Sequence, residues 1–192
     1  MARVPHVDPA TLPESYERVE RNSDSLHEDI DTEWWNAQST VRSFGNIPAL
    51  AEAHVDMNVA MWTETNLSPA EVEYVILTVA RAIDAPYVWH DHSIAALERA
   101  GMEEQEVLAI SRMQTGELPD EKRVLLEYVT EFIESGGDVS DDAHEALANF
   151  YSDERVVGIA MLAAYYVFLD HASSALGLEP DEEFLGWELE NY

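Results

Sequence analysis

The stretch from Leu67 to Gly101 constrains the fold most, because its sequence predicts two helices joined by a sharp turn. Ser68 and Glu71 have the spacing of a capping box, in which the two residues satisfy each other's backbone N–H groups at the start of a helix. Pro86 disfavours helical backbone at the residue before it, so the first helix should end there and a second should begin. The sequence therefore predicts a helical hairpin that ends at Gly101, a residue type common after helices.

Two ionisable side chains stand out within this hairpin. Glu73 interrupts the apolar pattern of the first helix, and His92 lies in the middle of the second. A carboxylate and an imidazole on antiparallel helices can form an acid–base couple or a short proton relay. The spacing also allows a plainer interpretation, in which Glu73 is a surface charge and His92 is a core histidine satisfied by a hydrogen bond. Both interpretations stay open on the sequence alone.

The second helix offers an apolar face beside His92. Ala85, Val88 and His92 follow i, i+3, i+7 spacing, so Ala85 and Val88 would wall a small pocket with the imidazole at its end. His90 and His92 are only two positions apart and point to different sides of a helix, unlike the i, i+4 pair of a zinc helix. We therefore expect no metal site here.

The net charge limits the choice of partners. The formal charge is −29, with 39 acidic residues against 10 basic ones, and Lys122 is the only lysine. Such a surface repels phosphate, so we expect neither nucleic acid nor an anionic membrane as partner. Acidic residues occur in every segment, a distribution typical of halophilic proteins, whose repulsion is screened at molar salt. An ordinary acidic protein is the alternative.

Further features favour a soluble cytoplasmic protein. The chain has no cysteine, which excludes disulfides and thiol chemistry within it. The first 22 residues have no apolar core of the kind found in a secretory signal. The longest apolar run, Val156–Leu169, is shorter than the roughly 20 residues of a membrane-spanning helix.

The rest of the chain predicts a single all-α domain, since no segment alternates with period two. We expect an N-terminal arm with helices over residues 1–46, a helical domain over 47–178 and an acidic tail over 179–192 that docks on the body or on a neighbouring subunit. The last helix is apolar nearly all round and should be central to the core. Outside the hairpin, the expected helices are Glu14–Arg21, Leu26–Val41, Pro48–Glu64 (with Leu50, Ala53, Met57 and Met61 on one face), Glu103–Met113, Pro119–Glu134, Ser140–Tyr151 and Glu154–Leu176.

The hairpin resembles the carboxymuconolactone decarboxylase family, which also contains the alkyl hydroperoxidase D-like proteins. The residues that carry the resemblance are Glu73 with Ile76 and Leu77, then Tyr87, Trp89 and His92, then Gly101. The resemblance implies a helical bundle of the hydroperoxidase D-like type, built around this hairpin, without a cofactor, that assembles as a homo-oligomer: a dimer, trimer or hexamer. Ala85 and Val88 occupy the positions of that branch's C-x-x-C pair, so its disulfide-based peroxide reduction cannot operate here.

The resemblance also implies a function and a set of site residues. His92 would handle a proton on a small carboxylated or lactone substrate, and Glu73 would orient or recharge it. Tyr87 and Trp89 would shape the pocket together with Ala85 and Val88. Two alternatives remain: a hydroperoxidase D-like oxidoreductase that has lost its cysteines, and a non-catalytic oligomer that binds a small ligand.

Overall fold

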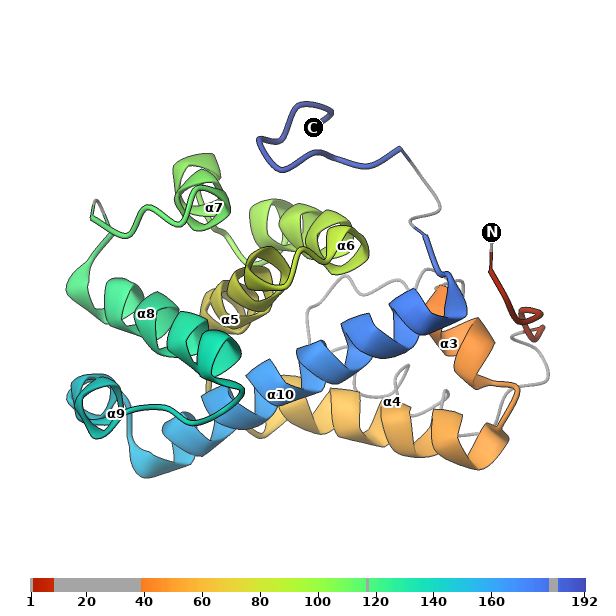
Figure 1. Cartoon of the computed structure of the whole chain (residues 1–192), viewed down its shortest axis with the longest axis horizontal. Helices are drawn as coiled ribbons and strands as arrows, with labels where there is room; N and C mark the ends of the chain where they lie inside the picture. The colour runs from red at the N-terminus through yellow and green to blue at the C-terminus, as the bar shows by residue number, and fades with distance from the viewer. Residues whose placement is uncertain (1, 9–38, 117, 180–182) are drawn as a thin grey trace. The chain divides into compact units, whose positions relative to one another are not determined.

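The computed structural model describes residues 2–8, 39–116, 118–179 and 183–192, and within these ranges it contains eight helices and no strand (Figure 1). The prediction of an all-α fold is confirmed. The expected helix Glu14–Arg21 and most of Leu26–Val41 lie outside the described residues. The helices are α3 (Ser39–Phe44), α4 (Pro48–Thr63), α5 (Pro69–Ala82), α6 (Pro86–Glu98), α7 (Glu104–Ser111), α8 (Asp120–Ser135), α9 (Asp141–Ala148) and α10 (Asp153–Leu176).

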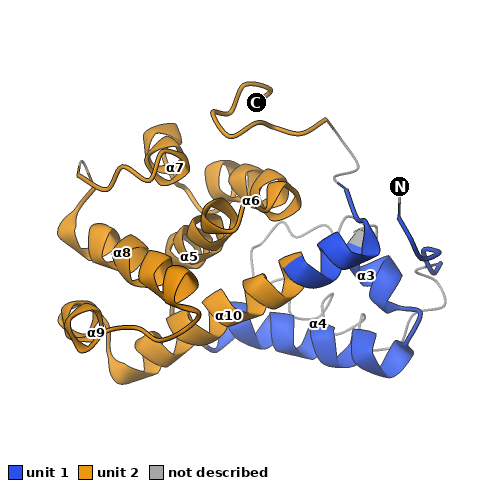
Figure 2. Cartoon of the chain, in the orientation of Figure 1, with its two compact units in different colours: residues 1–64, 171–181 blue, residues 65–170, 182–192 orange. Residues whose placement is uncertain are grey.

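The chain divides into two compact units (Figure 2). Unit 1 consists of residues 1–64 and 171–181, and unit 2 consists of residues 65–170 and 182–192. Helix α10 therefore contributes its first 18 residues, 153–170, to unit 2 and its last turns to unit 1. Unit 2 contains the whole predicted hairpin.

Helix α5 is the centre of unit 2. Every residue from Val72 to Ala80 is buried, and the helix packs against α6, α7 and α8. Its start is fixed by the predicted capping box: the Ser68 N–H donates to Glu71 Oε2 (2.7 Å), and the Glu71 N–H donates to Ser68 Oγ (3.3 Å). A helix buried on all sides gives its polar residues no access to bulk water, so each must find a partner within the protein.

A polar cluster joins α5 to its neighbours. The Tyr74 hydroxyl donates to Glu106 Oε1 on α7 (2.7 Å), and the Lys122 ammonium on α8 donates to the same oxygen. That ammonium also lies 4.7 Å from the centre of the Tyr74 ring. Burial and the nearby Glu106 carboxylate raise the pKa of the Tyr74 hydroxyl far above its usual value, so Tyr74 stays protonated as a donor.

Unit 1 corrects one sequence-based expectation. Its small core joins Val41 of α3 to Ala51 and Val55 of α4. The α4 face expected from the sequence is instead largely turned outward: Leu50 is 61% exposed and Ala53 and Met57 are exposed, while Met61 is buried. Helix α4 is apolar on more than one side, so periodicity alone could not tell which side packs against α3.

Helix α10 only partly matches the central core helix expected from the sequence. Ile159, Leu162 and Tyr166 are buried, but apolar side chains on the opposite face are exposed. Among the described residues, it is the one helix long and apolar enough to cross a membrane. Of that stretch, 56% is buried inside the molecule.

Candidate active site

A tight turn brings the two helices of the hairpin together. Asp84 adopts a left-handed backbone conformation (φ 57°), and the Ala85 N–H donates to the Ala80 carbonyl (2.8 Å). Pro86 then occupies the first turn of α6, where a missing N–H costs nothing. The turn folds α6 back along α5, so an early residue of α5 can face a middle residue of α6 (Figure 1).

Glu73 of α5 and His92 of α6 form a hydrogen-bonded pair. Glu73 Oε2 lies 2.9 Å from His92 Nδ1, so the expected contact is present. The Glu73 side chain is only 1% exposed and that of His92 is 18% exposed. The imidazole therefore reaches toward the solvent boundary, while the carboxylate lies entirely within the core.

The second oxygen of Glu73 is unpaired within the part of the chain that the structure describes. Oε1 is buried and makes no hydrogen bond to any described residue. An unpaired buried carboxylate oxygen is costly, on the order of 1–3 kcal/mol or more for a charged group. A buried polar atom that is left unsatisfied in a folded protein calls for an explanation, and a functional role is one such explanation.

Tyr166 of α10 adds a third side to the site. Its ring meets the His92 imidazole edge-on, with the ring centres 4.9 Å apart and the planes at 87°. Sequence reasoning missed this residue. The available signal was a buried tyrosine in an otherwise apolar helix, since a buried hydroxyl usually needs a polar neighbour.

The expected pocket residues all lie around the turn and the first half of α6. Ala85, Val88 and Trp89 are buried, and Tyr87 is partly exposed. The recorded contacts of Trp89 are with the C-terminal tail: its indole N–H donates to the Gly186 carbonyl (3.0 Å), and its ring lies 5.2 Å from that of Trp187. Trp89 therefore supports α6 from the side that the tail covers.

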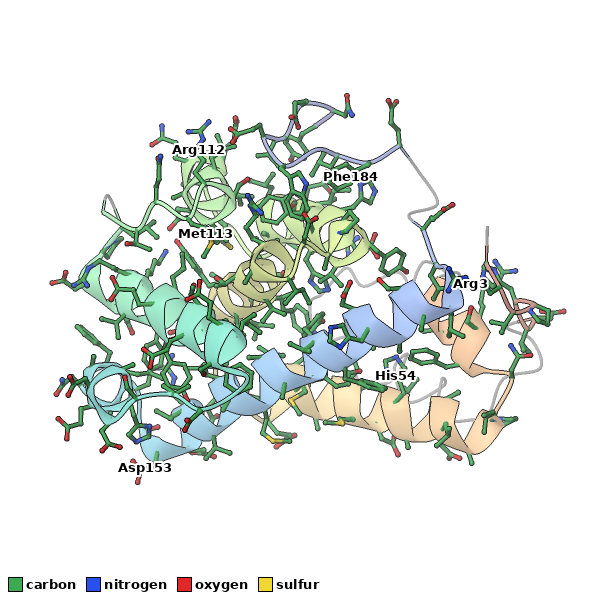
Figure 3. All side chains as sticks on the ribbon, viewed as in Figure 1. Arg3, His54, Arg112, Met113, Asp153 and Phe184 are labelled. Atoms are coloured by element: carbon green, nitrogen blue, oxygen red, sulfur yellow. The ribbon has the colours of Figure 1, made fainter. Side chains whose placement is uncertain are left out.

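The tail docks on unit 2 through several further contacts. His90 Nδ1 accepts a hydrogen bond from the Leu185 N–H (3.0 Å), which assigns His90 a structural partner on the tail. Arg112 at the end of α7 (Figure 3) donates to Glu188 Oε2 from both Nε (2.9 Å) and Nη2 (2.6 Å). These contacts hold α6 and α7 together. Of the two outcomes left open for the tail, the structure shows docking on the body of the same chain.

Arg81 is the basic residue of α5 and lies in its last turn. Its Nε donates to the Ser111 carbonyl (2.6 Å), and its guanidinium lies 5.0 Å from the centre of the Trp187 ring. Both contacts tie α5 to α7 and the tail. Arg81 therefore has a structural role at the opposite end of α5 from Glu73.

No metal centre accompanies the pair within the described residues. No group of three or more His, Asp or Glu side chains there could hold a metal ion. His90 faces the tail and His92 faces Glu73, so the two histidines serve different sides of α6. The chemistry that these residues offer by themselves is proton transfer.

Comparisons with solved structures show the same fold. A peroxidase-related protein from Ralstonia eutropha, with an alkylhydroperoxidase AhpD core, is 18% identical, covers 97% of this chain and 96% of its own, and has a TM-score of 0.72. A peroxidase-related protein from Silicibacter sp. TM1040 is 17% identical over 96% of this chain and 94% of its own, with a TM-score of 0.74. The debrominase Bmp8, solved as a cysteine-to-alanine variant with 2,3,4-tribromopyrrole, is 18% identical over 98% and 96%, with a TM-score of 0.71.

A family comparison is more specific to the hairpin. Curated proteins give no significant match to this sequence. Residues 48–116, however, match the model of the carboxymuconolactone decarboxylase family, and this range contains both Glu73 and His92. The resemblance inferred from the sequence is confirmed over the range that contains the hairpin and the Glu73–His92 pair.

Proposed function

We propose that this protein is a carboxymuconolactone decarboxylase-like enzyme that performs acid–base chemistry on a small lactone-type substrate with Glu73 and His92. The observation that carries the proposal is the 2.9 Å contact between Glu73 Oε2 and His92 Nδ1, made by a carboxylate that is 1% exposed. The match of residues 48–116 to the family supports it. A cytoplasmic homo-oligomer is part of the same proposal.

His92 is the proton-transfer group in this proposal. When Glu73 is ionised, the His92 Nδ1–H donates to Oε2, which leaves the lone pair of the neutral ring on Nε2. Nε2 then takes a proton from the carbon beside the lactone carbonyl, and the electron pair of the broken C–H bond is held as an enolate. The Glu73 carboxylate stabilises the imidazolium, which returns its proton to the substrate.

The charges around the pair favour an uncharged substrate. Arg81, Lys122 and Arg155 each have recorded partners elsewhere: the Ser111 carbonyl, Glu106 and Glu71. The charged group that contacts His92 in the described part of the chain is the Glu73 carboxylate. A carboxylate on the substrate would be repelled by this negative charge, so we favour a lactone over a free acid.

A thiol-dependent oxidoreductase is disfavoured by composition. The chain contains no cysteine, so neither a reactive thiolate nor a resolving thiol exists in it. The non-catalytic alternative needs only that the pair stabilise the fold. It predicts that removing His92 changes stability without removing any turnover.

The experiment is a substrate screen in roughly 1 M salt, where surface repulsion is screened. Lactones, carboxylated lactones, 2-oxo acids and peroxide with a thiol reductant would be assayed with wild-type protein. We expect turnover of a lactone that is lost in His92→Ala and strongly reduced in Glu73→Gln. The matched control is His144→Ala, which removes an exposed histidine on α9.

The outcomes separate the alternatives. Equal lactone turnover by wild type and His92→Ala would contradict the proposed role of the pair. Saturable peroxide turnover would instead favour the oxidoreductase, and the absence of turnover with all four substrate classes would favour the ligand-binding protein.

A further inference from the structure

The exposed positions of α10 form one continuous face. From residue 154 to 171 they recur with spacings of three and four, which places them on one side of the helix, and the positions between them are buried or half-buried. The first and last of these positions are polar and the inner ones are apolar. The face consists of Glu154, Val157, Met161, Ala164, Phe168 and His171. We call it the α10 seam.

The large side chains of the seam are well exposed. Val157 is 61%, Met161 46% and Phe168 53% exposed. The spacing is that of the a and d positions in a coiled coil, where such residues pack against a neighbouring helix. A contiguous exposed apolar face on a soluble protein commonly marks an interaction site.

The charge distribution makes this face unusual for this chain. About one residue in five is acidic, with 39 in 192, yet the run Val156–Leu169 contains no charged residue. The exposed face of α9 is different, since Asp141, Asp142 and Glu145 point to solvent there. The α10 seam is therefore a surface on which two strongly acidic molecules can approach without bringing carboxylates together.

The order of residues along the seam makes it complementary to itself. If a second copy lies antiparallel about a two-fold axis between residues 162 and 163, Val157 faces the partner's Phe168. Met161 then faces the partner's Ala164, so a long side chain meets a small one. At each end Glu154 faces the partner's His171, which can donate a hydrogen bond to it. This reciprocal pairing is what a two-fold interface requires.

We propose that the α10 seam is the contact surface for a second copy of this chain, with the two α10 helices antiparallel. The seam lies on the side of α10 away from Tyr166, which is buried and contacts His92. Pairing of the two seams would therefore restrict the movement of α10, the helix that places Tyr166 beside His92. The proposal stands whether or not the Glu73–His92 pair is catalytic.

The first test measures molecular mass. Sedimentation of the full chain in roughly 1 M salt should give a dimer or a multiple of it, because the Debye length there is about 3 Å and the −29 charge is screened. Met161→Glu places a carboxylate at the middle of the seam and should halve the mass, so a dimer would become a monomer. Phe150→Glu is the matched control, since Phe150 is 44% exposed outside the seam, and it should leave the mass unchanged.

The second test measures the register by cross-linking, which the cysteine-free background makes simple. Residues 157 and 168 are 11 positions apart on one helix, about 16 Å at 1.5 Å per residue. In the antiparallel register, position 157 of one copy is far from position 157 of the other, and the same holds for position 168. A disulfide needs Cα atoms within about 7 Å, so neither Val157→Cys alone nor Phe168→Cys alone should form one. A mixture of the two variants should form the mixed disulfide under mild oxidation.

Three results would overturn the proposal. Self-linked disulfides of each single variant without the mixed one would show a different register. If the wild type is a monomer and Met161→Glu has a lower melting temperature than the wild type, another segment of the same chain packs on the seam. The wild type could also be a monomer that floats with neutral phosphatidylcholine vesicles. If the Met161→Glu variant does not float with them, the seam is a membrane-binding surface.

Discussion

Glu73 Oε2 lies 2.9 Å from His92 Nδ1, while the other oxygen of the same carboxylate, Oε1, is buried and makes no hydrogen bond to any described residue. One half of the carboxyl group is thus satisfied and the other half is not. Because a buried charge is costly unless it is fully hydrogen-bonded, the pair should stabilise the fold less than an apolar contact of the same size.

The stability of this pair can be tested by replacing it with apolar residues. Removing one partner leaves the other buried and unsatisfied, so His92→Leu should lower the free energy of unfolding by roughly 1–3 kcal/mol. Replacing both, in Glu73→Leu with His92→Leu, should restore the wild-type value or exceed it, while abolishing any turnover. Denaturant unfolding of the single and double variants measures the difference.

Glu73→Gln is the control for size, since it keeps the shape of the side chain and removes its charge. It should unfold near the wild-type denaturant concentration. A double leucine variant less stable than either single variant would show that the pair stabilises the fold, and would weaken the case for a functional site.

The tail should depend on Trp89. The indole N–H of Trp89 donates to the Gly186 carbonyl, and both groups are buried. Trp89→Phe removes the donor and leaves the carbonyl unsatisfied, so we expect a loss of roughly 1–2 kcal/mol and faster proteolytic removal of residues 183–192. Limited proteolysis followed by mass spectrometry measures the release of the tail.

Tyr192→Phe is the matched control for the tail, because Tyr192 is an exposed aromatic residue at its end. It should leave the rate of proteolysis unchanged. A tail that is released equally fast in wild type and Trp89→Phe would contradict the anchoring role of the indole.

The hairpin could be predicted from the sequence because its signals are local. The capping box at Ser68 and Glu71 and the break before Pro86 act over a few residues, and the structure begins and ends α5 and α6 within about three residues of the expected positions. The contact of Glu73 with His92 follows from the same local geometry, because a tight turn between helices makes them antiparallel neighbours.

Other features depend on contacts between distant residues, which periodicity does not encode. The buried side of α4 is chosen by Val41 of α3, so an apolar stripe through Leu50 and Met57 was not a reliable guide. The partners of the tail on α6 and α7 lie about 75 to 100 positions away in the sequence. The same limit concealed Tyr166, since only the folded chain brings α10 against His92.

The net charge predicts a dependence on salt. With −29 charges on 192 residues, repulsion opposes both compaction and assembly at low ionic strength. Lowering the salt from about 1 M to about 0.05 M lengthens the Debye length from roughly 3 Å to more than 10 Å. We expect the melting temperature to fall and oligomers to dissociate, as seen by circular dichroism and sedimentation. Unchanged values across this range would contradict the halophilic interpretation.

The last prediction concerns His54 in unit 1. Burial lowers the pKa of His54 from 6.5 to about 4, and its ring packs edge-on against Phe44 at 4.9 Å. Between these two pH values the unfolded chain binds a proton that the folded chain does not, so acidification through this window favours unfolding. The full shift corresponds to a loss of up to about 3 kcal/mol on reaching pH 4.

The contribution of His54 is isolated by comparing variants. His54→Gln cannot titrate, so its free energy of unfolding should depend less on pH between 6.5 and 4 than that of the wild type, whatever its absolute stability. His144→Gln removes an exposed histidine and should keep the wild-type slope. Denaturant unfolding at steps across the window gives the three curves. Parallel curves for wild type and His54→Gln would mean that the proton reaches His54 in the folded protein, and that burial there does not exclude the charged imidazole.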